Sequence, residues 1–247
     1  MDNGEEKEIR KEFLLDRLIF FSDAVFAIII TIMILDVKLP ELAQNATEEE
    51  SKNAFLQIIW KLLAYGVSFA IIGSFWMRHF KIFSFLKDFT KKLIVLNLSF
   101  LFSVSLFPFA LSFWFSSSHI KHYSWGIYTF LAIILSAFFI QTLLIGHLVK
   151  NKAALCVGTH DVETELQWKS RRISYFTVPF LITLMIVAAW FNFEEYIVYL
   201  ALLFVRLGTM KINRHYYPHH RKNKVAAASL PGARKRRLKH PIRTQGQ

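Results

Sequence analysis

A few polar side chains lie inside or at the ends of otherwise apolar stretches, and these are the residues whose types could do chemistry. They are Ser22, Asp23, Trp76, His79 and Asn97. A carboxylate within hydrocarbon costs at least a few kcal/mol unless protein or water surrounds it. Because buried polar groups need partners, we expect these five to share one hydrogen-bond network. Spacing alone leaves a second interpretation open, in which Asp23 lies near a helix N-terminus and Trp76 and His79 belong to an interfacial belt.

These residues do not indicate an enzyme. The sequence contains no GxSxG, HExxH, Walker or GxGxxG motif, and the apolar stretches hold no pair of carboxylates that could act as acid and base. Its single cysteine, Cys156, excludes an intrachain disulfide, and Cys/His ligand spacings are absent. We therefore expect no enzyme, no catalytic residue, no metal site and no cofactor, and we interpret the polar residues as serving conduction or packing.

Membrane helices are the elements that must position these side chains. The chain has 247 residues, of which 54% are hydrophobic, with 25 Phe. Long apolar stretches cover about 18–37, 56–77, 93–115, 124–149, 173–191 and 194–212. A helix of such length crosses roughly 30 Å of hydrocarbon. The sequence therefore predicts an all-α integral membrane protein with six transmembrane helices. These helices form one domain over 17–212.

Charge predicts how these helices are oriented. The segment 38–55 is mainly acidic, whereas 78–92 and 150–172 are mainly basic, and basic short loops stay in the cytoplasm. Both termini are then cytoplasmic: an N-terminus over 1–16, with no cleaved signal peptide, and a basic tail over 213–247. We expect this tail to be disordered. It could contact anionic lipid headgroups or resemble a nucleic-acid arm, and we predict membrane lipids but no nucleic acid as partners.

Several motifs carry a resemblance to a known family. The stretch RLIFFSD, with Arg17, Phe21, Ser22 and Asp23, resembles the RxxxFSD signature that opens the first helix of the TMEM175 family of potassium-permeable channels. The resemblance continues through FWMRHFKIF, which holds Trp76 and His79, and through LNLSFLFSVSLFPF, which holds Asn97 and Pro108. It covers the first three helices specifically.

The resemblance implies a homotetramer in the plasma membrane, with one first helix per subunit lining a central pore. The family's pore is narrowed by apolar side chains at positions that here are Ile28, Ile32 and Leu35, and Thr31 is at the position linked to ion preference. Apolar constrictions gate by dewetting. The implied function is a cation channel with a hydrophobic gate and modest preference for K⁺ over Na⁺ and other monovalent cations, its only bound species being permeant K⁺. The implied network of Arg17, Ser22 and Asp23 shapes the pore helix.

Helical geometry is compatible with this assignment. At about 100° per residue, Ile28, Thr31, Ile32 and Leu35 form a stripe about 100° wide, and Asp23 points away from it. Isoleucines surround this helix, so periodicity alone would favour core packing. By the same geometry Arg17 faces the pore side, and joining the network would require a bent or frayed helix start. A secondary transporter and a non-conducting auxiliary membrane protein remain alternative functions.

Overall fold

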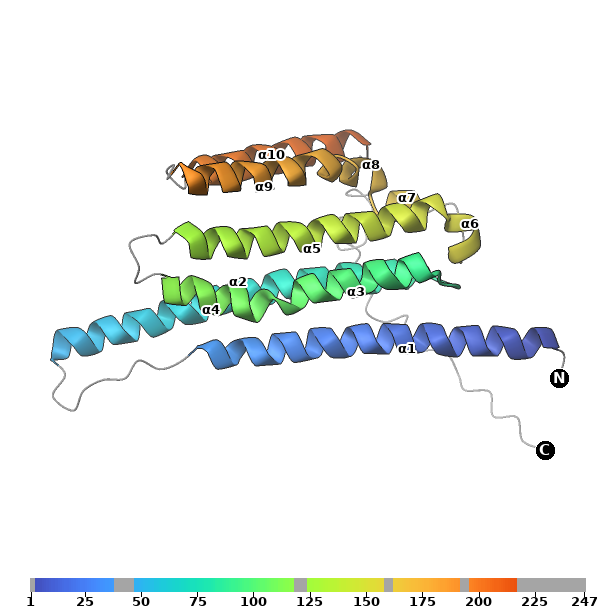
Figure 1. Cartoon of the computed structure of the whole chain (residues 1–247), viewed down its shortest axis with the longest axis horizontal. Helices are drawn as coiled ribbons and strands as arrows, with labels where there is room; N and C mark the ends of the chain where they lie inside the picture. Colours follow the sequence, from blue (N-terminus) through green and yellow to red (C-terminus); the bar gives the residue numbers. More distant parts are fainter. Residues whose placement is uncertain (1–2, 38–46, 118–123, 158–161, 192–195, 217–247) are drawn as a thin grey trace, which may run out of the picture.

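The computed structural model describes residues 3–37, 47–117, 124–157, 162–191 and 196–216, and these fold almost entirely into helices (Figure 1). In chain order the elements are α1 (Asn3–Ile32), the 3-10 helix η1 (Met33–Asp36), α2 (Glu48–Phe83), α3 (Lys91–Ser105), α4 (Phe107–Ser117), α5 (Ser124–Lys150), α6 (Lys152–Leu155), α7 (Val162–Glu165), α8 (Trp168–Arg171), α9 (Ser174–Trp190) and α10 (Tyr196–Tyr216). One isolated β-bridge pairs Leu86 with Cys156. The predicted all-α class is confirmed.

Local sequence signals explain where several helices begin. Thr47 forms a capping box with Glu50 at the start of α2, each side chain bonding the other's backbone N–H. The hydroxyl of Thr90 accepts from the backbone N–H of Leu93 and so caps α3. Pro108 occupies the first turn of α4, where a missing backbone donor does no harm, and the break between α3 and α4 lies just before it.

Five helices among the described residues are long and apolar enough to cross a membrane. They span Glu5–Leu35, Glu48–Phe83, Lys91–Ser116, Trp125–Lys150 and Trp168–Ala188, which correspond to the first five predicted spans. The sixth predicted span is also helical, as α10, but Arg206, Lys211 and Arg214 interrupt its apolar character. A sixth crossing therefore stays a prediction.

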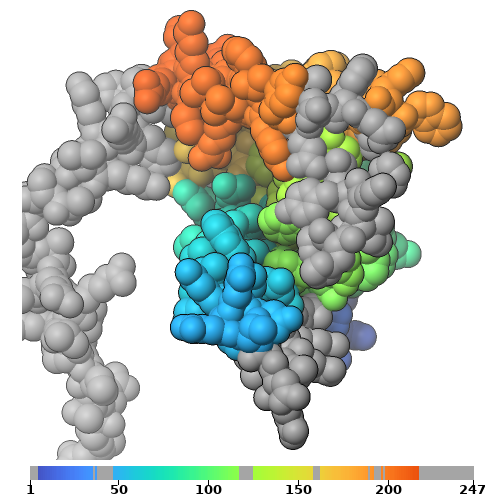
Figure 2. Space-filling view, turned by 90° about the vertical axis from the view of Figure 1, so that its left-hand side faces the viewer, coloured from blue at the N-terminus to red at the C-terminus, as the bar shows by residue number. Residues whose placement is uncertain are grey.

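The long helices run side by side in layers. In Figure 1, α1 lies along one edge, α9 and α10 lie along the opposite edge, and α5 lies between them and the α2, α3 and α4 layer. Figure 2 looks along the bundle from the end where α2 begins. In this view α10 lies above α2. The helix α5 packs on α3, α4 and α9, so it is the centre of the fold.

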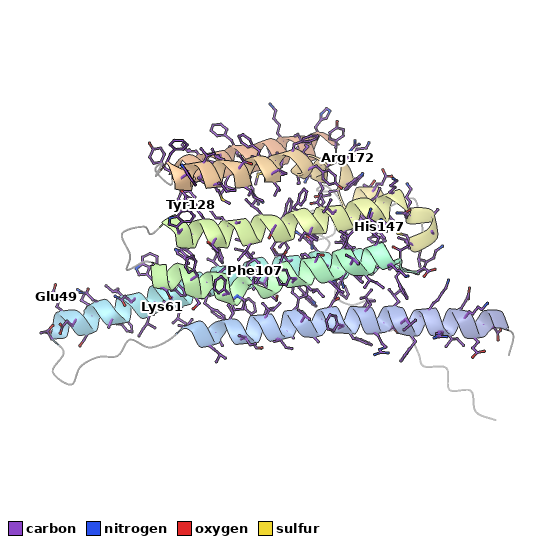
Figure 3. All side chains as sticks on the ribbon, viewed as in Figure 1. Glu49, Lys61, Phe107, Tyr128, His147 and Arg172 are labelled. Carbon is purple, nitrogen blue, oxygen red and sulfur yellow. The ribbon has the colours of Figure 1, made fainter. Side chains whose placement is uncertain are left out.

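Aromatic rings fill much of the core. Phe107, labelled in Figure 3, is fully buried, and its ring packs edge-on against Phe75 and Phe130 at centroid distances of 6.2 and 5.9 Å. A second buried cluster lies where α3 and α5 meet the segment of short helices after α5, and it includes Leu93, Leu148 and Cys156. The bundle is thus closed at this end by structured chain.

The predicted domain boundaries meet the helices at two places. The helix α1 begins at Asn3 and continues without a break through the boundary predicted between residues 16 and 17. The helix α10 extends to Tyr216, and residues 217–247 of the predicted basic tail lie outside the described residues.

Candidate functional site

Three buried polar side chains join α1, α2 and α3, and we call Ser22, Asn97 and His79 the polar chain. Nδ2 of Asn97 donates to Oγ of Ser22 at 2.9 Å, and Oδ1 of Asn97 lies 2.8 Å from Nε2 of His79. Because an amide oxygen can only accept, His79 donates through Nε2. The Ser22 hydroxyl in turn donates to the backbone oxygen of Leu18 at 2.9 Å. At most 2% of any of the three side chains is exposed.

Phenylalanine rings enclose the imidazole of this chain. The ring of His79 stacks on Phe83 at 4.2 Å and on Phe100 at 5.7 Å between centroids, and Phe26 lies 5.7 Å away. Sequence reasoning missed these rings. A signal was available, because each follows a member of the polar chain by three or four residues, the spacing that places two side chains on one helix face.

Asp23 has a different partner. Nε1 of Trp76 donates to Oδ1 of Asp23 at 2.9 Å, which forms a second contact between α1 and α2. This pair is partly exposed, with Trp76 at 39%. Ser22 and Asp23 are successive residues on a helix and therefore point about 100° apart, so they cannot both reach Asn97. The five side chains expected in one network are arranged as two separate sets.

Arg17 and Phe21 of the signature lie outside both sets among the described residues. The Arg17 guanidinium lies 5.9 Å from the centroid of the Phe13 ring, one turn back along α1, and both side chains are exposed. Phe21 is 51% exposed. The helix start is not frayed, since α1 is continuous from Asn3, and the Arg17 side chain is exposed.

One face of α1 and of η1, which continues it, is buried in the bundle and the other face is not. The exposed face holds the residues assigned to the constriction: Ile28 is 55% exposed, Ile32 46% and Leu35 71%. The buried face holds the residues that pack into the core, namely Ser22, Phe26, Ile29 and Met33. The described part of the chain therefore leaves an aliphatic stripe of α1 uncovered.

Thr31 lies on the exposed face, and its hydroxyl is held by its own helix. Oγ1 donates toward the backbone oxygens of Ala27 and Ile28, each at 2.9 Å. A hydroxyl has one hydrogen to donate and two lone pairs that accept. With the hydrogen directed at the backbone, the oxygen of Thr31 presents lone pairs to the exposed side.

Polar contacts also close the bundle at the end where α2 meets α3. Nζ of Lys11 on α1 lies 3.0 Å from Oδ2 of Asp88 in the α2–α3 connection. The hydrogen bond from Lys11, helped by the backbone N–H of Phe89, holds the pKa of Asp88 below its usual value. Nearby, Lys81 pairs with Glu165 and Lys152 with Glu163.

Cys156 is buried beside these contacts. Its neighbours in the chain pair with the α2–α3 connection through two backbone bonds, Lys87 N–H to the oxygen of Leu155 and Val157 N–H to the oxygen of Phe85, both at 2.8 Å. Burial raises the pKa of the thiol. Within the described residues no three His, Cys, Asp or Glu side chains gather as a metal site would require.

Comparison with known proteins finds a family whose profile is similar to the first part of this chain. The sequence profile described as "Endosomal/lysosomal potassium channel TMEM175" matches residues 17–108, which include the polar chain, the Asp23–Trp76 pair and the exposed face of α1. A potassium channel of Chryseobacterium sp. is 39% identical over 103 residues, covering 42% of this chain and 50% of the relative. A potassium channel of Streptomyces collinus is 39% identical over 89 residues, covering 36% of this chain and 41% of the relative.

More distant matches are also proteins named as channels. The endosomal/lysosomal proton channel TMEM175 of Mus musculus is 28% identical over 136 residues, covering 53% of this chain and 25% of the relative. The crystal structure of a lysosomal potassium-selective channel TMEM175 homolog from Chamaesiphon minutus matches with a TM-score of 0.56 and 21% identity, covering 79% of this chain and 97% of that chain. The curated matches span half or less of each relative's length. All of these names are names of channels and not of enzymes.

Proposed function

We propose that this chain is a potassium-permeable cation channel that assembles as a homotetramer, and the TMEM175 match over residues 17–108 supports the proposal. The observation that carries the proposal is the two-sided character of α1. Its inner face is buried, and the helix is hydrogen-bonded to α2 and α3, whereas Ile28, Ile32 and Leu35 face outward and remain 46–71% exposed. Four such faces around one axis would form a narrow aliphatic pore.

Closure of this pore would come from its lack of ligands for an ion. Rings of isoleucine and leucine supply no oxygen to replace the hydration shell of K⁺, and a narrow apolar constriction empties of water. Opening must widen the ring by rotating or shifting α1. The hydrogen bond from Asn97 to Ser22 resists rotation of α1, because rotation would separate two buried polar groups.

Ion preference would come from Thr31. Four threonine oxygens with lone pairs on the exposed side can replace part of the hydration shell of a cation in the open state. A ring of flexible hydroxyls is a weaker filter than a cage of backbone carbonyls, so we expect modest selectivity for K⁺ over Na⁺. The proposed setting is the plasma membrane, with both termini in the cytoplasm.

Purified protein in liposomes tests the function. A channel passes K⁺ down its gradient without a coupled solute, a secondary transporter requires that solute, and an auxiliary protein passes nothing. We expect uncoupled K⁺ flux, with smaller flux when Na⁺ or Cs⁺ replaces K⁺, and a parallel measurement with H⁺ completes the comparison. Absence of flux from a correctly folded oligomer would contradict the proposal.

A further inference from the structure

A cavity of about 400 Å³ lies between α2, α5, α8, α9 and α10, on the opposite side of the bundle from α1. Three arginines from different helices line it: Arg78 near the end of α2, Arg171 at the end of α8 and Arg206 in α10. Hydroxyls line it as well, among them those of Ser170, Ser174 and Thr209. Such a lining offers many hydrogen-bond donors around one space.

No acidic side chain is among the residues that line this cavity. The ion pairs found in the described part of the chain involve the lysines Lys11, Lys81 and Lys152, and none involves a cavity arginine. Arg78 is also close enough to Arg206 and to Arg171 for like-charge repulsion with each of them. Positive charge is concentrated here without a matching negative charge from the described protein.

Arg171 gives the sharpest indication of a missing ligand. Its guanidinium lies 5.5 Å from the centroid of the Phe138 ring, which supports the cation through a cation–π contact. Its Nη1 is nevertheless buried with no hydrogen-bond partner. Leaving a buried charge unpaired is costly, and native structures normally satisfy such a group with protein, water or a ligand.

We propose that this cavity binds a phosphate group, held by the guanidinium groups of Arg78, Arg171 and Arg206. Arginine is suited to phosphate because its planar fork can donate two parallel hydrogen bonds. Two sources supply this chemistry, the headgroup of an anionic lipid and free phosphate. The lipid is the source we expect, because Arg78 and Arg171 lie near helix ends of a membrane-spanning bundle, where headgroups bind basic pockets between helices. The buried Oδ1 of Asn213, also without a partner, can accept from a headgroup hydroxyl.

Thermal unfolding in detergent tests the site with the full chain. Dioctanoyl phosphatidylglycerol should raise the Tm of the wild-type protein, whereas dioctanoyl phosphatidylcholine should raise it far less. In Arg171→Met and in Arg206→Gln the concentration of phosphatidylglycerol that gives half of the Tm shift should rise about tenfold or more. The matched control is Arg172→Gln. Arg172, labelled in Figure 3, is the exposed neighbour of Arg171, and its substitution should leave the half-maximal concentration of phosphatidylglycerol unchanged.

Inorganic phosphate distinguishes the two sources. If it raises the Tm as phosphatidylglycerol does and the shift depends on the same arginines, the site binds free phosphate; if only the lipid acts, the source is a headgroup. Both results support a phosphate site. A wild-type Tm that neither probe changes, or a shift that survives in both variants, overturns it. Arg206 is exposed, so its substitution tests the site even if the Arg171 variant does not fold.

Discussion

The amide oxygen of Asn97 lies 2.8 Å from Nε2 of His79, and this hydrogen bond joins α3 to α2 out of contact with solvent. The nitrogen of the same amide donates to Ser22 on α1. One side chain thus holds three helices in register, and its two bonds set the rotation of α1 relative to the bundle.

Replacing Asn97 with leucine should destabilise the protein. Asn97→Leu keeps a similar volume but removes the partner of Nε2 of His79, at about 1–3 kcal/mol for an unsatisfied buried group, and also removes the bond to Ser22, whose hydroxyl keeps its bond to Leu18. Chemical unfolding in detergent measures the change. Asn53→Leu, at an exposed position near the start of α2, is the control and should have little effect. Equal stability of the two variants would contradict a structural role for the polar chain.

The contact between Trp76 and Asp23 should be measurable as a pairwise coupling. Trp76→Phe keeps an aromatic ring and removes the N–H that donates to Asp23, and Asp23→Asn weakens the same bond from the other side. A double-variant cycle on unfolding should give a coupling of about 0.5–3 kcal/mol. Trp60→Phe, at a position 69% exposed, should show none with Asp23→Asn.

Asp23→Asn should also impair assembly or opening while leaving ion preference unchanged. Asp23 points toward α2 and away from the exposed stripe of α1, so its charge does not line the proposed pore. Size-exclusion chromatography and bilayer recordings report assembly and opening separately. A clear change in K⁺/Na⁺ permeability ratio in a normally assembled protein would be inconsistent with this position.

A polar group in the proposed constriction should make the closed pore leak. Ile28→Asn places an amide among the aliphatic side chains, which holds water in a space that would otherwise empty. We expect a higher resting K⁺ conductance in bilayers, by about tenfold. Ile28→Leu keeps the surface apolar and should stay close to wild type. Unchanged conductance in Ile28→Asn would show that this residue does not line the constriction.

Thr31 should govern ion preference through its oxygen. Thr31→Val keeps the shape but removes the lone pairs, so the K⁺/Na⁺ permeability ratio should fall toward one, whereas Thr31→Ser retains the hydroxyl and should preserve the ratio. Reversal potentials with K⁺ on one side and Na⁺ on the other measure it. Equal ratios in the valine and serine variants would remove Thr31 from the selectivity mechanism.

Cys156 should react slowly in the native protein. Burial raises the pKa of its thiol, and only the thiolate attacks a maleimide, so near neutral pH both access and ionisation are low. Labelling should become fast after denaturation. A matched exposed thiol is available as Val157→Cys in a Cys156→Ala background, since Val157 is 66% exposed. Native Cys156 that reacts as fast as this control would mean that the end of the bundle opens readily.

Long apolar stretches could be located well from the sequence. The stretches predicted at 124–149 and 173–191 correspond to α5 (Ser124–Lys150) and α9 (Ser174–Trp190) within about one residue. The first residues of α1 and α2 could not be located from hydropathy, because their first turns are charged and lie before the apolar stretches 18–37 and 56–77. Hydropathy does not detect a solvated helical turn, whereas the Thr47 cap marks the start of α2 directly.

The sequence could predict which side chains of the candidate site lie at a similar depth in the membrane, but not which of them form hydrogen bonds with one another. Sequence spacing indicated that Ser22, Asp23 and Asn97 lie at one level, but which one faces Asn97 depends on the rotation of α1. The cavity arginines were not predictable in this way. Arg171 belongs to a segment that looks like a basic loop, and its burial depends on α8, which follows a left-handed turn at Gln167 with φ of 53°.

The uninterrupted length of α1 means that it can act as a lever with its pivot at Ser22. Lys11, tied to Asp88, lies about 16 Å along the axis on one side of this pivot, and Ile28 lies about 9 Å along on the other. A sideways displacement near Lys11 would therefore move Ile28 in the opposite direction by about half as much. A force applied near Lys11 would therefore reach the aliphatic stripe through one continuous helix.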